Sequence, residues 1–221
     1  MYPPGRLWAP VQPIWSFARP AAVRRSYQAR GTAPPSRRVG SAGVTDRDDL
    51  LAMIRQLAVV HGDVILSSGQ RADWYIDLRR LLLDGRAAPV AGRVMLDTTR
   101  SLSYDAVGGL TLGADPVATA MLHAAAARGG KLDAFVVRKS EKAHGLQRRI
   151  EGPDVAGRRV LAVEDTSTTG SSVLTAVDAL QEAGAVVVGV AVVVERGARA
   201  NIAERGLPYL PAFELADLGL D

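Results

Sequence analysis

Strand-length apolar runs alternate with helical segments over the second half of the chain, and this alternation restricts the fold more than any other feature. Short apolar runs predict buried strands, and apolar residues at helical spacing fill the segments between them. This alternation is typical of a parallel sheet that helices cover on both faces. The expected fold is therefore α/β with a doubly wound parallel sheet. The predicted strands are 105–109, 132–137, 159–163 and 186–194, and the predicted helices are 115–128 and 171–183.

Weaker patterns precede this region. Thr45 is a candidate N-cap, and apolar residues at helical spacing predict a helix from there to about His61. Two strand-like pieces, 64–66 and 74–78, lie on either side of a Ser-Gly turn. A second helix is expected over 88–101.

The N-terminal 44 residues differ in composition from the rest of the chain. They are rich in Pro, Arg, Ala, Ser and Gly without an apolar period, which is typical of segments that cannot form a core. We predict a disordered extension at 1–44 and one domain at 45–221. A start codon set too far upstream, a transit peptide and an interaction arm are alternatives for the extension.

Charge and composition exclude several classes of function. The net charge is +4, but seven arginines lie within residues 1–45, which leaves 20 basic against 23 acidic residues and a net charge of −3 for the remainder. A broad nucleic-acid-binding face is therefore not expected. The chain has no cysteine, which excludes disulfides and thiolate chemistry. No apolar run approaches the roughly 20 residues of a membrane span, and a cytoplasmic location is expected.

The segment 160–173, VLAVEDTSTTGSSV, carries the strongest chemical signal. An apolar strand ends in Glu164 and Asp165, and a Thr- and Ser-rich loop with one glycine leads directly into a helix. Free N–H groups at a helix N-terminus and side-chain hydroxyls bind a phosphate there. The loop consists of Thr166, Ser167, Thr168, Thr169, Gly170, Ser171 and Ser172.

Two adjacent carboxylates restrict the class of ligand that this loop can bind. They would repel a polyphosphate, and the GxxxxGK[ST] sequence of nucleotide triphosphate sites is absent. They suit a ribose, whose hydroxyls need acceptors and whose C1 becomes cationic during transfer. The alternative is a polar loop in which Glu164 and Asp165 are solvated. The segment resembles the phosphoribosyl pyrophosphate (PRPP) motif of type I phosphoribosyltransferases, with Glu164 in place of the commoner aspartate.

A basic loop follows the strand that ends near Arg138. Loops of about 20 residues inside a domain are usually lids or disordered segments, and a solvated charged loop is the alternative here. The sequence Arg138-Lys139-x-x-Lys142-x-His144-Gly resembles the catalytic loop of orotate phosphoribosyltransferases. The resemblance implies that the loop closes over PRPP, that Lys142 reaches the site of a neighbouring subunit in a homodimer, and that His144 donates a proton or hydrogen bond to the leaving pyrophosphate.

Looser similarities to the same family concern the base. Segment 66–79 resembles its N-terminal hood, in which Tyr75 and Ile76 would flank orotate, although core packing is the alternative for these aromatic and apolar residues. Arg196 ends the last long strand and would hold the carboxylate of orotate, with Thr168 beside it. The run 108–117 resembles the turn that receives pyrophosphate. Ser67 and Gly113 stand where many members of the family have lysine.

These similarities imply the type I phosphoribosyltransferase fold with a small N-terminal hood. The implied reaction transfers the phosphoribosyl group of PRPP to orotate and gives orotidine 5′-monophosphate and pyrophosphate, with Mg²⁺ carried on PRPP and no metal site formed by the protein. A purine or uracil phosphoribosyltransferase and a PRPP-sensing regulator that binds nucleic acid are alternatives. The expected partners are PRPP, orotate and a second copy of the chain, without nucleic acid or membrane. His61 and His123 are interpreted as structural or surface residues in helices.

Overall fold

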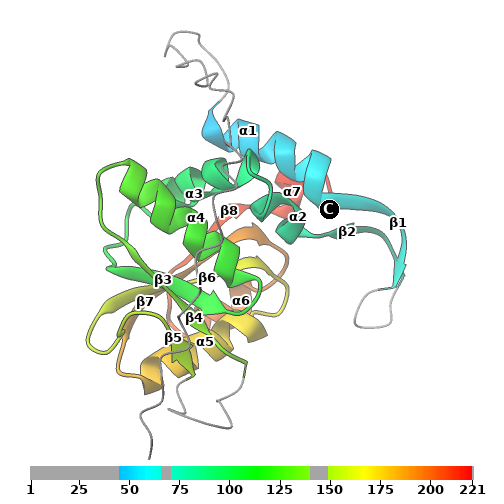
Figure 1. Cartoon of the computed structure of the whole chain (residues 1–221). Coiled ribbons are helices and arrows are strands. Elements are labelled where there is room, and N and C mark those ends of the chain that lie inside the picture. Colours follow the sequence, from blue (N-terminus) through cyan, green and yellow to red (C-terminus); the bar gives the residue numbers. More distant parts are fainter. Residues whose placement is uncertain (1–44, 66–70, 140–148, 221) are drawn as a thin grey trace, which may run out of the picture. The chain divides into compact units, whose positions relative to one another are not determined.

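A six-stranded sheet with the strand order β5-β4-β3-β6-β7-β8 lies at the centre of the fold (Figure 1). The computed structural model describes residues 45–65, 71–139 and 149–220. All neighbouring strands of this sheet run parallel except β4 and β5, which are antiparallel. The strands are β3 (Ala106–Leu110), β4 (Asp133–Val137), β5 (Ile150–Glu151), β6 (Arg159–Ser167), β7 (Val186–Glu195) and β8 (Tyr209–Phe213).

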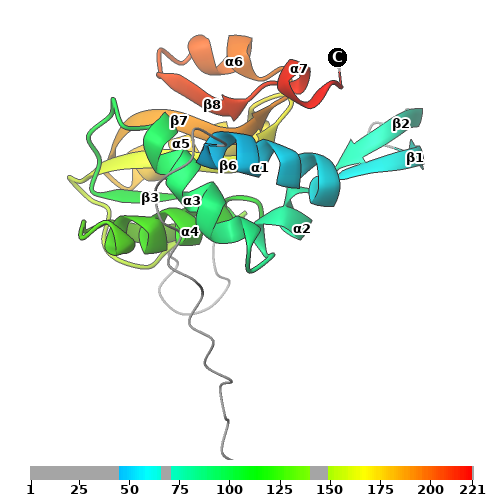
Figure 2. The ribbon, with the colours of Figure 1, turned by 90° about the horizontal axis from the view of Figure 1, so that it is seen from above.

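Helices cover both faces of this sheet, as the alternating sequence predicts (Figures 1 and 2). Helices α3 and α4 pack on one face, and α5 packs on the other. The doubly wound α/β architecture is thereby confirmed. The helices of the described chain are α1 (Asp46–Met53), the π-helical turn η1 (Ile54–Ala58), α2 (Leu78–Leu82), α3 (Ala87–Thr98), α4 (Ala114–Ala127), α5 (Ser171–Glu182), α6 (Arg199–Ala203) and α7 (Leu215–Leu218).

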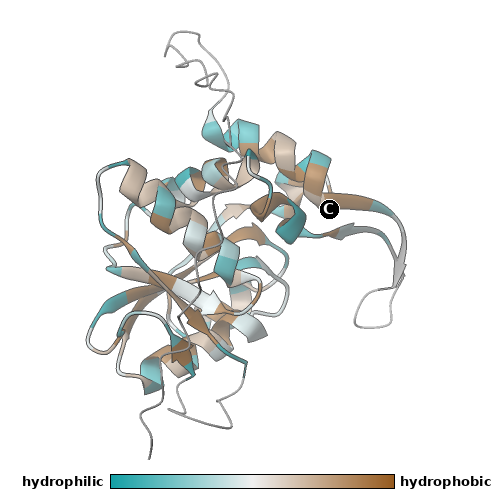
Figure 3. Cartoon of the chain, in the orientation of Figure 1, coloured by the Kyte–Doolittle hydropathy of each residue, from teal (hydrophilic) through white to brown (hydrophobic). Residues whose placement is uncertain are grey.

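Strand β6 shows why the sheet needs cover on both sides. Successive side chains of a strand point to opposite faces, and here Leu161 and Val163 join the core beneath α3 and α4, while Val160 and Ala162 join the core beneath α5. All four side chains are fully buried. The hydropathy colouring in Figure 3 shows the same concentration of apolar residues along the central strands.

The N-terminal hood is an antiparallel pair formed by β1 (Val59–Ile65) and β2 (Arg71–Ile76), which extends to one side of the sheet (Figures 1 and 2). Helix α1 begins at Thr45, whose hydroxyl accepts from the backbone N–H of Asp48 at 3.2 Å, so the predicted cap is confirmed. The predicted helical end at His61 is wrong. Val59, Val60 and His61 are extended and pair with β2, because β-branched residues pack well on a strand.

Other boundaries also differ from the sequence-based expectation. Asp77 caps α2, so the predicted strand to Leu78 ends at Ile76. Asp115 was the predicted N-cap of α4, with Pro116 as the first helical residue, but both lie inside the helix, which begins at Ala114 with Gly113 as its N-cap. Strand β8 was missed because Pro211 lies inside it, and proline is compatible with a strand only at an edge such as this one. No helix among the described residues is long and apolar enough to cross a membrane.

Candidate active site

The carboxyl ends of β3 and β6 meet where the strand order of the sheet reverses. The chain passes from β3 to β4 on one side and from β6 to β7 on the other. A crevice forms outside the sheet at such a reversal, and ligands of doubly wound folds bind there. A cavity of about 320 Å³ opens at this point. It is lined by Tyr75, Ile76, Asp77, Arg79, Leu110, Thr111, Leu112, Gly113, Lys139, Glu164, Asp165, Thr166 and Ser172.

Glu164 and Asp165 form the acidic wall of this cavity. The structure places them within β6, so the strand is four residues longer than predicted and ends at Ser167. Glu164 is 5% exposed. Burial, and then the charge of Asp165, raise the pKa of Glu164 to about 8. Burial also raises the pKa of Asp165. A pair of this kind holds a proton near neutral pH and accepts hydrogen bonds from ligand hydroxyls.

The turn after β3 approaches this acidic pair closely. A Cβ atom on Gly113 would lie 2.1 Å from Oε1 of Glu164 and 2.8 Å from Oδ1 of Asp165. Both distances are far below ordinary van der Waals contact, which begins near 3.4 Å. A side chain at position 113 would therefore displace the carboxylates of Glu164 and Asp165 from the positions that they hold here.

The loop between β6 and α5 presents polar groups at the helix N-terminus. Gly170 adopts a left-handed conformation with φ of 79°, which favours glycine, and it is the N-cap residue of α5. The side chains of Thr168, Thr169, Ser171 and Ser172 are exposed, whereas Ser167 is buried. Asn201 of α6 donates from Nδ2 to the backbone oxygen of Thr169 at 2.8 Å and supports the loop from outside.

Thr166 has an unpaired hydroxyl at the cavity wall. Its Oγ1 atom is buried and has no hydrogen-bond partner within the described parts of the chain. Its backbone N–H donates to Oδ1 of Asp165 at 2.7 Å, which fixes the direction of that carboxylate. Since buried hydroxyls normally have partners, Thr166 offers a free donor or acceptor to a ligand.

The predicted base-binding residues come from hood strand β2, from the loop after β6 and from the end of β7. Tyr75 and Ile76 line the cavity, and Ile76 also belongs to the core. The guanidinium carbon of Arg196 lies 5.6 Å from the centre of the Trp74 ring, within the range of a cation–π contact. The backbone N–H of Arg196 donates to the oxygen of Ser167 at 2.9 Å. Nε of Arg196 is buried without a partner in the described structure, which leaves a donor for an anion.

The predicted lid is described only at its two ends. Lys139 is exposed and lines the cavity, and Arg138 lies beside Glu151 with Nη1 3.4 Å from Oε1. Lys142 and His144 fall within 140–148, and Ser67 falls within 66–70, so all three lie outside the described residues.

Comparison with known proteins identifies the family to which this site belongs. The Phosphoribosyl transferase domain model matches residues 95–204, which include both β3 and β6. Orotate phosphoribosyltransferase of Streptomyces avermitilis is 66% identical over 178 residues, which are 79% of this chain and 98% of that protein. The chain belongs to the orotate phosphoribosyltransferase family.

Solved structures agree with this family assignment. The Mycobacterium tuberculosis H37Rv orotate phosphoribosyltransferase in complex with Fe(III) dicitrate is 58% identical, with a TM-score of 0.74 over 80% of this chain and 100% of that chain. The same mycobacterial enzyme in complex with PRPP has a TM-score of 0.70 and 52% identity, with the same coverage. The type I phosphoribosyltransferase fold and the orotate phosphoribosyltransferase reaction are therefore confirmed, and the purine, uracil and regulator alternatives are rejected.

The cavity also contains residues that the sequence did not single out. Arg79 and Asp77 come from the start of α2, next to the predicted base-binding strand. The only local signal was a polar Asp-x-Arg-Arg sequence after Tyr75 and Ile76, which is also typical of an ordinary capped helix. The prediction that His61 lies in a helix is wrong, because it lies on β1. The prediction for His123 is confirmed, because it is an exposed residue of α4.

Proposed function

We propose that the cavity at the ends of β3 and β6 binds PRPP and orotate and performs the transfer characteristic of the family. The single observation that carries this assignment is the buried pair Glu164 and Asp165 directly before a loop that starts α5. N1 of orotate bonds to C1 of the ribose as the C1–oxygen bond breaks. Pyrophosphate leaves with the bonding electron pair, and the N1 proton passes to solvent.

Glu164 and Asp165 are assigned to the ribose. Their oxygens accept hydrogen bonds from the ribose hydroxyls, and the negative charge that the pair keeps beside its shared proton favours the positive charge that develops at C1. Both carboxylates are buried, so these interactions act at low dielectric and are stronger than in water. The 5′-phosphate is assigned to the loop 166–172, where α5 directs its free N–H groups outward.

The orotate ring is assigned to the hood side of the cavity. Tyr75 and Ile76 provide apolar surface for the ring, with Thr168 at the edge of the phosphate loop. Arg196 is assigned to the carboxylate of orotate. Its buried and unpaired Nε atom supports this role, because a carboxylate accepts from an arginine in two parallel hydrogen bonds.

Magnesium fits this site as an ion carried on PRPP. Glu164 and Asp165 offer carboxylate oxygens, which are ligands that Mg²⁺ uses together with substrate phosphates. No group of three or more metal-ligating side chains lies within the described ranges. When bound, the ion neutralises part of the charge of the pyrophosphate. The protein's own contribution is to orient the ribose beside the two carboxylates.

The roles of Lys142 and His144 rest on the family resemblance and stay predictions. Lys142 would enter the site of a second subunit, and His144 would donate to the leaving pyrophosphate. Lys139 at the start of the loop lines the cavity and adds positive charge there, whereas the preceding Arg138 is paired with Glu151. The cytoplasmic location also stays a prediction.

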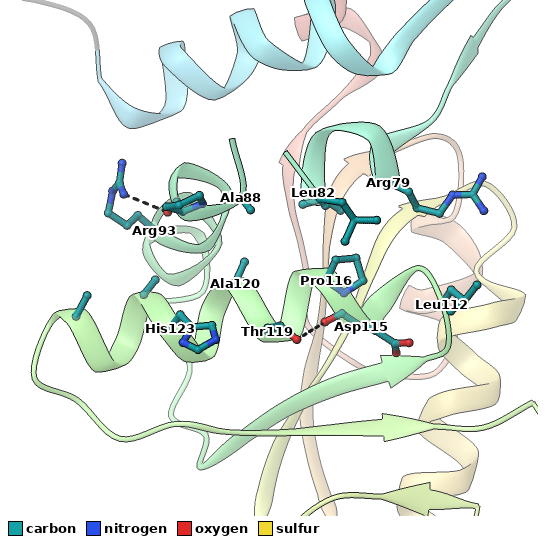
Figure 4. Close-up of a pocket in the computed structure, with 14 residues that line it drawn as sticks. Arg79, Leu82, Ala88, Arg93, Leu112, Asp115, Pro116, Thr119, Ala120 and His123 are labelled. Atoms are coloured by element: carbon teal, nitrogen blue, oxygen red, sulfur yellow. Dashed lines mark hydrogen bonds between the residues drawn. The ribbon is translucent and has the colours of Figure 1, made fainter. Parts of the chain in front are cut away.

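An apolar groove next to the cavity is the surface we assign to a second copy of the chain. This groove, between α2, α3 and α4, has a volume of about 540 Å³ (Figure 4). Leu83 and Leu112 at this groove are 76% and 67% exposed, which is unusual for large apolar side chains. Arg79 and Leu112 line both the groove and the cavity, so a partner seated here adjoins the site. A lid that acts in the neighbouring subunit needs this proximity.

The direct test mixes the purified chain with PRPP, Mg²⁺ and orotate, uracil or hypoxanthine in turn and measures pyrophosphate. Release with orotate alone is expected, and release with uracil but not orotate would reject the function. Lys142→Ala should lose turnover while it remains folded. For the dimer, Leu112→Glu should lower the sedimentation coefficient to that of a monomer, whereas Val186→Glu, at another exposed apolar residue, should not.

A mixed-dimer experiment tests whether the lid acts across subunits. Lys142→Ala and Arg196→Ala chains are each expected to be inactive alone. If Lys142 acts in the partner's site, hybrids of the two contain one intact site, and random mixing should restore roughly a quarter of the wild-type activity. No recovery on mixing would show that the lid acts within its own subunit.

A further inference from the structure

Arg79 brings a positive charge into the cavity from an element outside the phosphate-binding loops. It is the second residue of α2, directly after the hood strand that carries Tyr75 and Ile76. Its side chain lines the cavity together with Thr111, Leu112 and Gly113 from the turn after β3. Figure 4 shows Arg79 and Leu112 at the same end of the neighbouring groove, where the groove meets the cavity.

Asp77 anchors this arginine without using all of its donors. Nε of Arg79 donates to Oδ1 of Asp77 at 3.0 Å, and Nη2 lies 3.4 Å from the hydroxyl of Tyr75. The same carboxylate accepts from the backbone N–H of Arg79 at 3.2 Å and so caps α2. A guanidinium has five N–H donors, and 49% of this side chain is exposed. The anchored arginine therefore keeps terminal N–H groups for a ligand.

The charge in the cavity requires such a group. Glu164 and Asp165 are acidic, and the pyrophosphate of PRPP adds several negative charges beside them. Among the described lining residues, Arg79 and Lys139 are the two cationic ones. The turn after β3 supplies no third cation, because position 113 is a glycine in this chain.

We propose that Arg79 binds the pyrophosphate group of PRPP and holds it as it leaves. This inference rests on the proposed function and adds a binding residue to it. A planar guanidinium forms two parallel hydrogen bonds with phosphate oxygens, which a lysine does not. Arg79 acts on the wall formed by residues 111–113, away from the loop that receives the 5′-phosphate.

The test compares Arg79→Ala with Arg80→Ala, its neighbour on the same helix. Both arginines are exposed, but only Arg79 lines the cavity. Loss of a charged hydrogen-bonding group costs about 10- to 100-fold in affinity. Arg79→Ala should therefore raise the KM for PRPP and the inhibition constant of pyrophosphate by about that factor, with the KM for orotate changed by less than about twofold. Arg79→Lys should fall between alanine and wild type, because it keeps the charge but loses the planar fork.

Controls separate this inference from the proposed function and from effects on folding. Thermal denaturation and sedimentation should give wild-type values for both alanine variants. Calorimetric titration with magnesium pyrophosphate measures binding without turnover, so it tests Arg79 whether or not orotate is the substrate. Wild-type pyrophosphate affinity in both Arg79→Ala and Arg79→Lys overturns the inference and leaves the function intact. Failure of the wild type to react with orotate overturns the function, while the titration still decides the role of Arg79.

Discussion

Substitution of Gly113 by alanine should damage catalysis through Glu164. Gly113 has φ of −61° and ψ of −44°, a conformation that alanine adopts readily, so the backbone itself opposes nothing. The only obstacle is the Cβ atom, which would lie 2.1 Å from Oε1 of Glu164 and so must displace that carboxylate by more than 1 Å.

The displacement of the Glu164 carboxylate determines how far kcat/KM should fall. Glu164 lines the cavity, so its carboxylate would move into the space that we assign to the ribose. A misplacement of about 1 Å in a reacting site can cost about 100-fold in rate, which corresponds to about 2.7 kcal/mol. We therefore expect kcat/KM to fall about 100-fold in Gly113→Ala, with the far-ultraviolet circular dichroism spectrum unchanged.

A compensating change sharpens this test. Glu164→Asp withdraws the carboxylate by one carbon–carbon bond, about 1.5 Å, which relieves most of the overlap with a Cβ at position 113. The double variant Gly113→Ala/Glu164→Asp should therefore recover at least about tenfold of the lost kcat/KM. Gly85→Ala is the control, because a Cβ there meets nothing within 4 Å. Wild-type kcat/KM in Gly113→Ala, or equal losses in the single and double variants, would refute the reasoning.

Three further predictions concern other parts of the described chain and its extension. Because burial and Asp165 raise the pKa of Glu164 from 4.5 to about 8, the folded state keeps a proton that the unfolded state loses, so the free energy of unfolding without ligand should fall as pH rises from 4.5 to 8. Urea denaturation at several pH values should show that the free energy of unfolding falls less steeply with pH in Glu164→Gln than in the wild type. An equal dependence on pH in the two proteins would contradict this. Glu195 is buried and accepts from the backbone N–H groups of Gly197 and Arg199, so it positions the turn that carries Arg196. Glu195→Gln should therefore raise the KM for orotate about tenfold, while the KM for PRPP changes less than about twofold. Equal increases in the two KM values would show that Glu195 does not position Arg196. Removal of residues 1–42 should leave kcat/KM within about twofold of wild type, and a larger loss would assign those residues a role in the reaction.

The sequence alone was sufficient for the four central strands of the sheet, the phosphate loop and the family, but not for the edge strands β5 and β8. Val160 to Val163 had to form a buried strand because four consecutive apolar residues leave no polar face. Glu164 and Asp165, followed by a Ser- and Thr-rich loop and a helix, carried enough chemistry to predict ribose phosphate binding. Each of these patterns depends on residues that are neighbours along the chain, so it can be recognised from the sequence alone.

The tertiary structure decided which distant residues share the site. Asp77 and Arg79 precede Gly113 by 36 and 34 residues, and Glu164 follows it by 51, yet the fold brings all four residues around one cavity at the ends of β3 and β6. The close approach of Gly113 to Glu164, where a Cβ atom at position 113 would lie 2.1 Å from Oε1, cannot be predicted from the spacing of the two residues in the sequence. The same is true of the raised pKa of Glu164, because burial is a property of packing between elements and not of the residues beside it.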